Sequence, residues 1–286
     1  MTRVGIYGYE CTKIYEFYGC RIVPLYSQFT QVKKLASDQN CYHLTAFLEI
    51  SDECPYELKS LVFNLEAVLS FIDHKDVIIT NQLRSNETYD CLDDDFPKEV
   101  QGHFRQNGGG CVIMSDAFSE NSREVFIRKS LDVLLSETTP VNTAFRGAFF
   151  RCIEVFRGRG SFIDVSYYLL FSGLESFCRA ILDDYKSKNC ATPITRVLVG
   201  YGFDVKQENL DSHYKSVMTY VHLRNALFHN GQLEKTTKNG DTFKLTDYFS
   251  PLCRLLPLVL IKFIEFDDGY LNWNCWLDRQ PFKGRK

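Results

Sequence analysis

The sequence predicts an α+β N-terminal region followed by an all-α helical bundle. In the first part of the chain, short segments rich in β-branched and aromatic residues are separated by Gly, Pro, Ser and Asn, which is typical of strands joined by turns. From about residue 118, apolar residues recur at helical spacing instead. A chain of 286 residues is long enough for two hydrophobic cores. We therefore expect two domains, residues 1–117 and residues 118–286.

The N-terminal region combines strands with one helix. Apolar residues recur every three or four positions after Pro55, so we expect a helix up to about residue 72. No pattern in this region indicates a reaction, and we interpret it as a sensor or partner-binding domain. Strands are expected at residues 6–14, 18–25, 42–50, 77–80 and 111–114.

Two unusual runs in the N-terminal region are interpreted as loops. Residues 93–95 are three consecutive Asp, but metal-binding loops space their ligands so that they converge on the ion. Residues 108–110 are three consecutive Gly, but no Gly-Lys-Ser/Thr sequence follows, as a phosphate-binding loop requires. A solvated acidic turn and a glycine-rich loop are therefore expected.

The second domain is expected to contain several helices joined by short connections, as in a helical bundle. Asn121 and Glu124 form a capping-box pattern ahead of the first apolar run, and a Thr-Pro or Ser-Pro pair opens three later runs. Gly-Arg-Gly at residues 158–160 ends the second helix. Helices are expected to begin near residues 121, 139, 162, 192, 209 and 250.

Composition and cysteine usage exclude several classes of protein. The hydrophobic content of 45% is that of an ordinary globular protein, and no run of about 18 apolar residues could span a membrane. The N-terminus lacks the pattern of a signal peptide. The 11 Cys are odd in number and include no Cys-x-x-Cys pair, which argues against a disulfide framework and against a zinc site. We expect a cytoplasmic protein with reduced thiols, no metal and no cofactor.

Charge is distributed unevenly between the two parts. Residues 1–115 carry 10 Lys and Arg against 16 Asp and Glu, a balance of −6, whereas residues 116–286 carry 23 against 20, a balance of +3. The C-terminal part is therefore better suited to a polyanion. Its excess is well below that of a dedicated nucleic-acid-binding protein, so any contact with RNA would be local.

An arginine on the helix expected at residues 209–230 stands out. At 100° per residue, the apolar arc of this helix contains Arg224 near its centre and Asn225 inside it, while Lys215, Ser216, Thr219 and His222 lie opposite. A guanidinium that faces a core is costly unless it is paired and hydrogen-bonded. Arg224 is therefore expected to be held for a partner. The apolar arc comprises Leu210, Tyr214, Val217, Met218, Val221, Leu227 and Phe228.

The same helix is expected to end at a histidine. Asn230-Gly231 is typical of a left-handed helix end, which places His229 in the last turn, where the exposed carbonyls favour the imidazolium. Arg224 and His229 are separated by about 7.5 Å of rise and roughly 140° of rotation. Long side chains at this offset can converge on one phosphate, with a fork of donors from arginine and a titratable proton from histidine.

These residues resemble a known family. The segment 223–231, Leu-Arg-Asn-Ala-Leu-Phe-His-Asn-Gly, resembles the signature of HEPN domains, in which an Arg is followed by four to six residues and a His. The likeness covers roughly residues 120–266, and the ApeA-like branch, with a β-rich region before its helices, is the most similar. Glu175 resembles the acidic position on the helix that pairs with the arginine helix. It could hold Arg224, or it could pair with Arg179 one turn later.

The resemblance implies a metal-independent endoribonuclease in which two HEPN domains meet across a two-fold axis. His229 would move the proton of the 2′-hydroxyl or of the leaving oxygen, Arg224 would stabilise the phosphoryl charge, and Asn225 would orient the imidazole or hold a phosphate oxygen. The protein would act as a toxin-like or antiphage effector on RNA, as a homodimer, with a regulator or trigger bound by the N-terminal domain. The alternative is a non-catalytic HEPN module for dimerisation or for binding RNA or a nucleotide.

Overall fold

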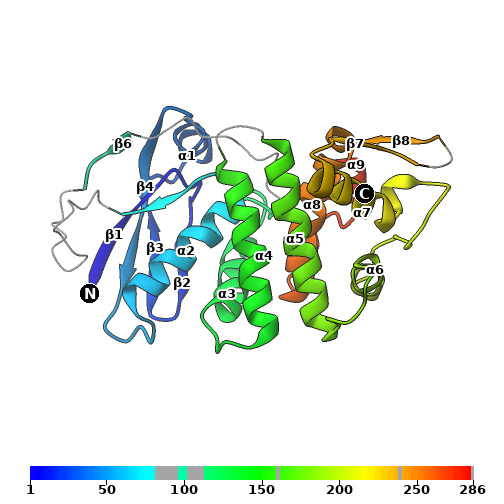
Figure 1. Cartoon of the computed structure of the whole chain (residues 1–286). Coiled ribbons are helices and arrows are strands. Elements are labelled where there is room, and N and C mark those ends of the chain that lie inside the picture. Colours follow the sequence, from blue (N-terminus) through cyan, green and yellow to red (C-terminus); the bar gives the residue numbers. More distant parts are fainter. Residues whose placement is uncertain (81–95, 102–112, 159–161, 238–239, 285–286) are drawn as a thin grey trace. The chain divides into compact units, whose positions relative to one another are not determined.

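The chain has a mixed α and β structure in which strands and helices are unevenly distributed (Figure 1). Most strands lie in the N-terminal part, and most helices follow them, as the sequence predicts. In the part of the chain described, no helix is both long enough and apolar enough to cross a membrane. The computed structural model describes residues 1–80, 96–101, 113–158, 162–237 and 240–284.

The chain divides into two compact units, and the boundary differs from the predicted one. The first unit comprises Met1–Ser136 and Phe156–Arg159, and the second comprises Glu137–Val155 and Gly160–Lys286. The division falls after Ser136 rather than after residue 117, because the helix α3 (Ser122–Leu134) packs against strands and helices of the first unit. Helical periodicity alone could not reveal this, since it does not indicate which core the apolar face of a helix joins.

The first unit is built on an antiparallel sheet with β4 at its centre. Most of β4 lies between β1 and β3, and its first three residues pair with β6 instead. β2 continues the sheet beside β3, and β5 continues it beside β1. The strands are β1 (Thr2–Tyr7), β2 (Tyr15–Phe17), β3 (Cys20–Pro24), β4 (Cys41–Ile50), β5 (Ile78–Ile79) and β6 (Glu99–Gln101).

Three helices accompany this sheet in the described part of the first unit. α2 (Leu58–Asp73) is buried along most of its length, as its continuous apolar spacing predicts. α3 packs on α2, where the rings of Phe71 and Phe126 stack at 5.6 Å. α1 (Phe29–Ala36) packs against β4 and was not predicted, since only Val32 and Ala36 on it are buried.

Several predictions for the N-terminal region were wrong or lie outside the described residues. The first strand is Thr2–Tyr7 rather than residues 6–14, and Gly8, with φ of 78°, follows it in the left-handed region. Ile113 and Met114 are not in a strand, and the two residues before them are outside the described part. The acidic run 93–95 and the glycine run 108–110 are also outside it.

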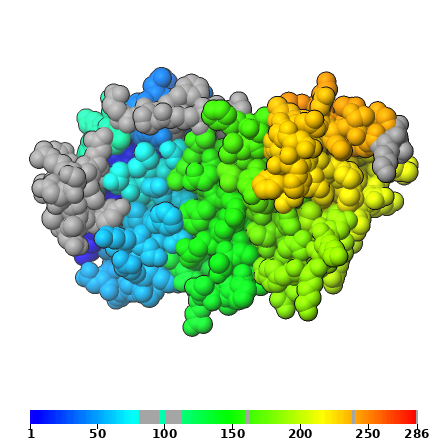
Figure 2. All heavy atoms as spheres, viewed as in Figure 1, coloured from blue at the N-terminus to red at the C-terminus, as the bar shows by residue number. Residues whose placement is uncertain are grey.

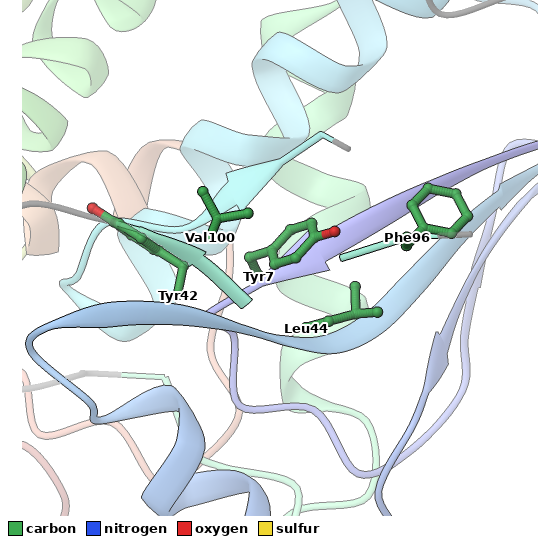
Figure 3. Close-up of a cluster of buried hydrophobic side chains, with 5 residues drawn as sticks. All are labelled: Tyr7, Tyr42, Leu44, Phe96 and Val100. Atoms are coloured by element: carbon green, nitrogen blue, oxygen red, sulfur yellow. The ribbon is translucent and has the colours of Figure 1, made fainter. Parts of the chain in front are cut away.

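Buried side chains gather where β4 passes from β6 to β1. Tyr7, Tyr42, Leu44, Phe96 and Val100 form this group, which we call the β4 cluster (Figure 3). The hydroxyl of Tyr42 donates a hydrogen bond of 2.6 Å to Asp76 at the edge of the group. The β4 cluster fixes which residues of β4 and β6 face the core, because side chains alternate between the two faces of a strand.

The second unit is a group of helices in which α5 packs against several others. α5 packs against α6, α7 and α8, and α9 packs on α8. A hairpin of two short strands, β7 (Glu234–Thr236) and β8 (Thr242–Lys244), follows α7 and was not predicted. The helices are α4 (Pro140–Arg157), α5 (Ile163–Leu182), α6 (Ala191–Gly200), α7 (Val217–Asn230), α8 (Leu245–Phe263) and α9 (Cys275–Asp278).

The rings of α4, α5 and α8 meet in the core of the second unit. Phe145, Phe177 and Phe263 lie with their ring centroids 5.1–5.9 Å apart. Gly173 of α5 allows the three helices to approach closely, because a Cβ there would lie 3.2 Å from Leu256 of α8 and 3.4 Å from the α4 backbone. The side chains of α4 and α5 leave little space between these helices in the space-filling view (green in Figure 2).

The last long helix begins earlier than the sequence predicts. α8 begins at Leu245 rather than near residue 250, and Pro251 and Pro257 lie inside it. A proline inside a helix removes a backbone hydrogen bond and normally ends the pattern. Here both prolines are buried with the apolar residues around them, so packing of the helix outweighs the local preference.

Candidate functional site

The helix that carries the predicted site is shorter than expected. α7 begins at Val217 rather than near residue 209, because Ser216 is extended and forms a bridge with Lys206. Leu210 and Tyr214 therefore precede the helix and are exposed. The predicted end is confirmed, since α7 finishes at Asn230 and Gly231 has a φ of 62°. His229 consequently lies in the last turn.

The buried face of α7 differs from the predicted apolar arc. Thr219 was expected on the solvent side but is 2% exposed, whereas Phe228 was expected inside and is 57% exposed. The reason is that α7 packs against α5, α6 and both strands of the hairpin, so it is covered on more than one side. Arg224 therefore lies at the edge of the buried face, with its side chain 27% exposed.

Arg224 has several partners in the second unit. Its Nη2 lies 3.7 Å from Oε2 of Glu175, and its Nη1 donates a hydrogen bond of 3.0 Å to Oδ1 of Asn225. The guanidinium also lies over the rings of Phe228 and Phe171, at 5.4 and 5.9 Å from their centroids. The expectation that this arginine needs a carboxylate partner agrees with these contacts.

Glu175 contacts both of the arginines that the sequence offered as alternative partners, Arg224 and Arg179. Its Oε2 faces Arg224, and its Oε1 accepts a hydrogen bond of 3.0 Å from Nε of Arg179 one turn later on α5. Arg179 is held in turn by the backbone oxygens of Asp184 and Ser187. One carboxylate, 19% exposed, thus orients two guanidinium groups.

We expect Glu175→Gln to reduce the free energy of unfolding by about 1–2 kcal/mol, because a half-buried charged acceptor is replaced by a neutral one of equal size and solvent partly screens the pairs. Thermal and urea unfolding would measure the change. Glu154→Gln, at an exposed position on α4, is the matched control and should change stability by less than about 0.5 kcal/mol. Equal stabilities of the two variants would contradict the role given to Glu175.

His229 is exposed at the end of α7 and shares a neighbour with Arg224. The ring of Phe228 lies 5.3 Å from the imidazole, nearly perpendicular to it, and the same ring lies under the guanidinium of Arg224. Among the described residues, no hydrogen bond or ion pair joins Arg224 to His229 directly. The two groups therefore pack on the same aromatic ring, with the imidazole open to solvent.

Asn225 is half-buried and accepts a hydrogen bond from Arg224, so the structure places it with the arginine rather than with the imidazole. The roles expected for Asn225 were to orient the imidazole or to hold a phosphate oxygen, and a contact with Arg224 was not predicted. Since Asn225 directly follows Arg224 on the helix, its amide fixes the guanidinium without using a residue from another element. It is best described as a positioning residue for Arg224.

Two features beside the site were not found from the sequence. Tyr168 of α5 stacks on Phe228 at 5.7 Å, and both rings are partly exposed. An open groove of about 710 Å³ borders Glu175 and Arg179, with Thr139 and Tyr185 also in its wall. An exposed aromatic residue three places before a buried one is a weak signal, so only the packing of α5 on α7 could reveal the pair.

The chain was compared with family models, with curated proteins and with solved structures, and none of them matches it. The likeness to HEPN domains therefore depends on the residues of α5 and α7 themselves. What is observed is a half-buried arginine held by a glutamate and an asparagine, beside an exposed histidine at a helix end.

Proposed function

We propose that this protein is a metal-independent endoribonuclease and that its second unit is a HEPN-like helical bundle. One observation supports this most strongly. Arg224 is oriented by Glu175 and Asn225 yet keeps 27% of its side chain exposed, and the exposed imidazole of His229 packs on the same Phe228 ring as its guanidinium. A fixed cation beside an accessible proton carrier is what the cleavage of a phosphodiester requires.

The proposed reaction uses the 2′-hydroxyl of RNA as the nucleophile. The 2′-oxygen attacks phosphorus as its proton is removed, and the bond from phosphorus to the 5′-oxygen breaks as that oxygen gains a proton. His229 carries one of these protons, and Arg224 stabilises the charge on the phosphoryl oxygens. The products are a 2′,3′-cyclic phosphate and a free 5′-hydroxyl. DNA lacks the nucleophile and is not cut.

A homodimer through the second unit would complete this site. The reaction needs one group to remove a proton and another to supply one, whereas each chain contributes a single imidazole at this place. Phe162, directly before α5, and Val165 and Tyr168 in its first turns are exposed, and Tyr168 stacks on Phe228. We propose that this apolar surface meets its copy across a two-fold axis, which brings two His229 side chains to one phosphodiester.

The proposal extends to the role of the whole chain. By analogy with the family, we propose a toxin-like or antiphage effector whose first unit binds a regulator or trigger. The first unit carries the negative charge balance and the second unit the positive one, which supports a polyanion-binding role for the second.

The test is to incubate the purified protein with total RNA in the presence of EDTA and to map the cleavage ends. We expect 2′,3′-cyclic phosphate and 5′-hydroxyl ends, and no cleavage when the mapped nucleotide is replaced by its 2′-deoxy form. A His229→Ala preparation, purified in parallel, reports contaminating ribonuclease. Equal cleavage by the two preparations, or 5′-phosphate ends, would contradict the proposal.

A non-catalytic module is the alternative function, and the exposed pair of Tyr168 and Phe228 favours it. Stacked aromatic rings beside an arginine can hold a base without any reaction. Under this alternative the protein binds RNA or a nucleotide, Phe228→Ala weakens binding, and no ends appear in the cleavage experiment.

A further inference from the structure

Four side chains with metal-binding atoms meet at the start of β4 in the first unit. Nε2 of His43 lies 3.0 Å from Oδ2 of Asp38 and 3.2 Å from Sγ of Cys41. Sγ of Cys41 lies 3.8 Å from the same oxygen of Asp38. Oε2 of Glu99 lies 3.6 Å from Nδ1 of His43 and 3.8 Å from the sulfur. A thiol, an imidazole and two carboxylates thus surround one small volume.

The register of the sheet explains why these residues meet. Tyr42 of β4 and Val100 of β6 are paired and belong to the β4 cluster (Figure 3). Because side chains alternate between the faces of a strand, Cys41 and His43 lie on the opposite face of β4. Glu99 is paired with His43 and shares that face. Packing of Tyr42 and Val100 in the β4 cluster therefore places Cys41, His43 and Glu99 together on the opposite face of the sheet.

The distances fit a tetrahedral metal ion. With metal–sulfur bonds of about 2.3 Å and metal–nitrogen or metal–oxygen bonds of about 2.0–2.1 Å, tetrahedral ligand atoms are separated by roughly 3.3–3.6 Å. The three separations among Oδ2 of Asp38, Sγ of Cys41 and Nε2 of His43 are 3.0, 3.2 and 3.8 Å. Shifts of a few tenths of an ångström would bring all three atoms to a common centre. Three protein ligands leave one position for water.

The groups that contact His43 and Asp38 are also of the kind that orients ligands in metal sites. A ligating histidine usually donates its second ring N–H to a carboxylate, which fixes the ring, and Glu99 lies beside Nδ1 of His43 in that position. The backbone N–H of Asn40 donates a hydrogen bond of 2.8 Å to Oδ1 of Asp38, so that the other oxygen faces the histidine and the cysteine.

We propose that Asp38, Cys41 and His43 bind a divalent transition-metal ion, for which Zn²⁺ has the matching ligand preferences, and that Glu99 positions His43. The site would join the turn before β4 to β6 and stabilise the first unit. The sequence did not indicate it, because Cys-x-His on a strand with an Asp three residues earlier matches no zinc-finger spacing. This proposal departs from the expectation of no metal for this chain, and it concerns the first unit, whereas the ribonuclease proposal concerns the second.

The test is a titration of the metal-stripped, reduced full-length protein with Co²⁺, followed by competition with Zn²⁺. We expect one equivalent of Co²⁺ to bind with the charge-transfer absorption of a cobalt–thiolate bond, and Zn²⁺ to displace it. Cys41→Ser should lose this absorption. Cys54→Ser removes a partly exposed thiol elsewhere in the first unit and should keep it.

A further variant tests the site without removing a ligand. Glu99 is 59% exposed, so Glu99→Gln should fold normally, and we expect it to bind the metal about 10–100-fold more weakly. Zn²⁺ should also raise the melting temperature of the wild type and of Cys54→Ser but not of Cys41→Ser. Equal Co²⁺ spectra for Cys41→Ser and the wild type, or no binding at all, would overturn the proposal. RNA is absent throughout, so the outcome is independent of the ribonuclease test.

Discussion

Arg123→Met is expected to lower the free energy of unfolding of the first unit by about 3–5 kcal/mol. The guanidinium of Arg123 is 3% exposed and lies 3.2 Å from a carboxylate oxygen of Glu10 and 3.1 Å from one of Asp73. It also donates to the backbone oxygen of Glu10. Removing it would leave two carboxylates in the core without their cation, which costs more than the pair itself contributes.

The loss should also depend on pH. Burial raises the pKa of Glu10 to about 6, and Arg123 opposes that rise. Without the arginine, the pKa of Glu10 in the folded state would rise further above its unfolded value. A carboxyl with a raised pKa weakens the fold as pH increases through that pKa, because its charged form is disfavoured only in the folded state. The deficit of the variant should therefore be smaller at pH 5 than at pH 8.

Urea unfolding at the two pH values would measure both effects. Arg128→Met is the matched control on the same helix, since Arg128 is 46% exposed and pairs with Glu124 one turn away. An exposed pair of this kind contributes at most about 1 kcal/mol. If the two variants lost equal stability, the buried cluster of Arg123, Glu10 and Asp73 would not be the feature that stabilises this unit.

Local signals were sufficient to predict the elements that form against a continuous apolar face. α2, α4 and α5 begin and end within a few residues of their predicted bounds, because each has a continuous apolar spacing and, in α2 and α4, a proline near the start agrees with it. α1 and the hairpin of β7 and β8 were missed, since few of their residues are buried. The predicted start of α8, near residue 250, was too late. Pro251 lies inside the helix, where its burial outweighs the local cost of proline.

Local sequence signals also predicted only part of the candidate site. Arg224, Asn225 and Glu175 could be chosen from their sequence context, and the structure places the three in contact. The stacking of Tyr168 on Phe228 depends on how α5 crosses α7, which no local pattern encodes. Asp38, Cys41 and His43 have a spacing that matches no zinc-finger pattern, and Glu99 joins them only through the register of β4 and β6, so a search for metal-binding spacings along the chain could not detect the cluster.

His229→Ala and Arg224→Lys are expected to reduce RNA cleavage by roughly 10²–10⁴-fold and 10²–10³-fold, respectively. The first removes the proton carrier. The second keeps the charge but replaces the planar fork that Glu175 and Asn225 orient, so the donors no longer match two phosphoryl oxygens. Initial rates on a defined RNA would be compared, with circular dichroism to confirm folding. His222→Ala, on the same helix, is the control and should retain full activity.

Mixtures of the wild type with His229→Ala would show how many chains form one site. If each chain cuts RNA alone, activity falls in proportion to the wild-type fraction. If two His229 side chains act on one phosphodiester as base and acid, a mixed dimer lacks one of them. After subunit exchange, activity then falls as the square of the wild-type fraction. A linear decrease would contradict the shared site while leaving the roles of Arg224 and His229 intact, because those roles depend only on the geometry within one chain.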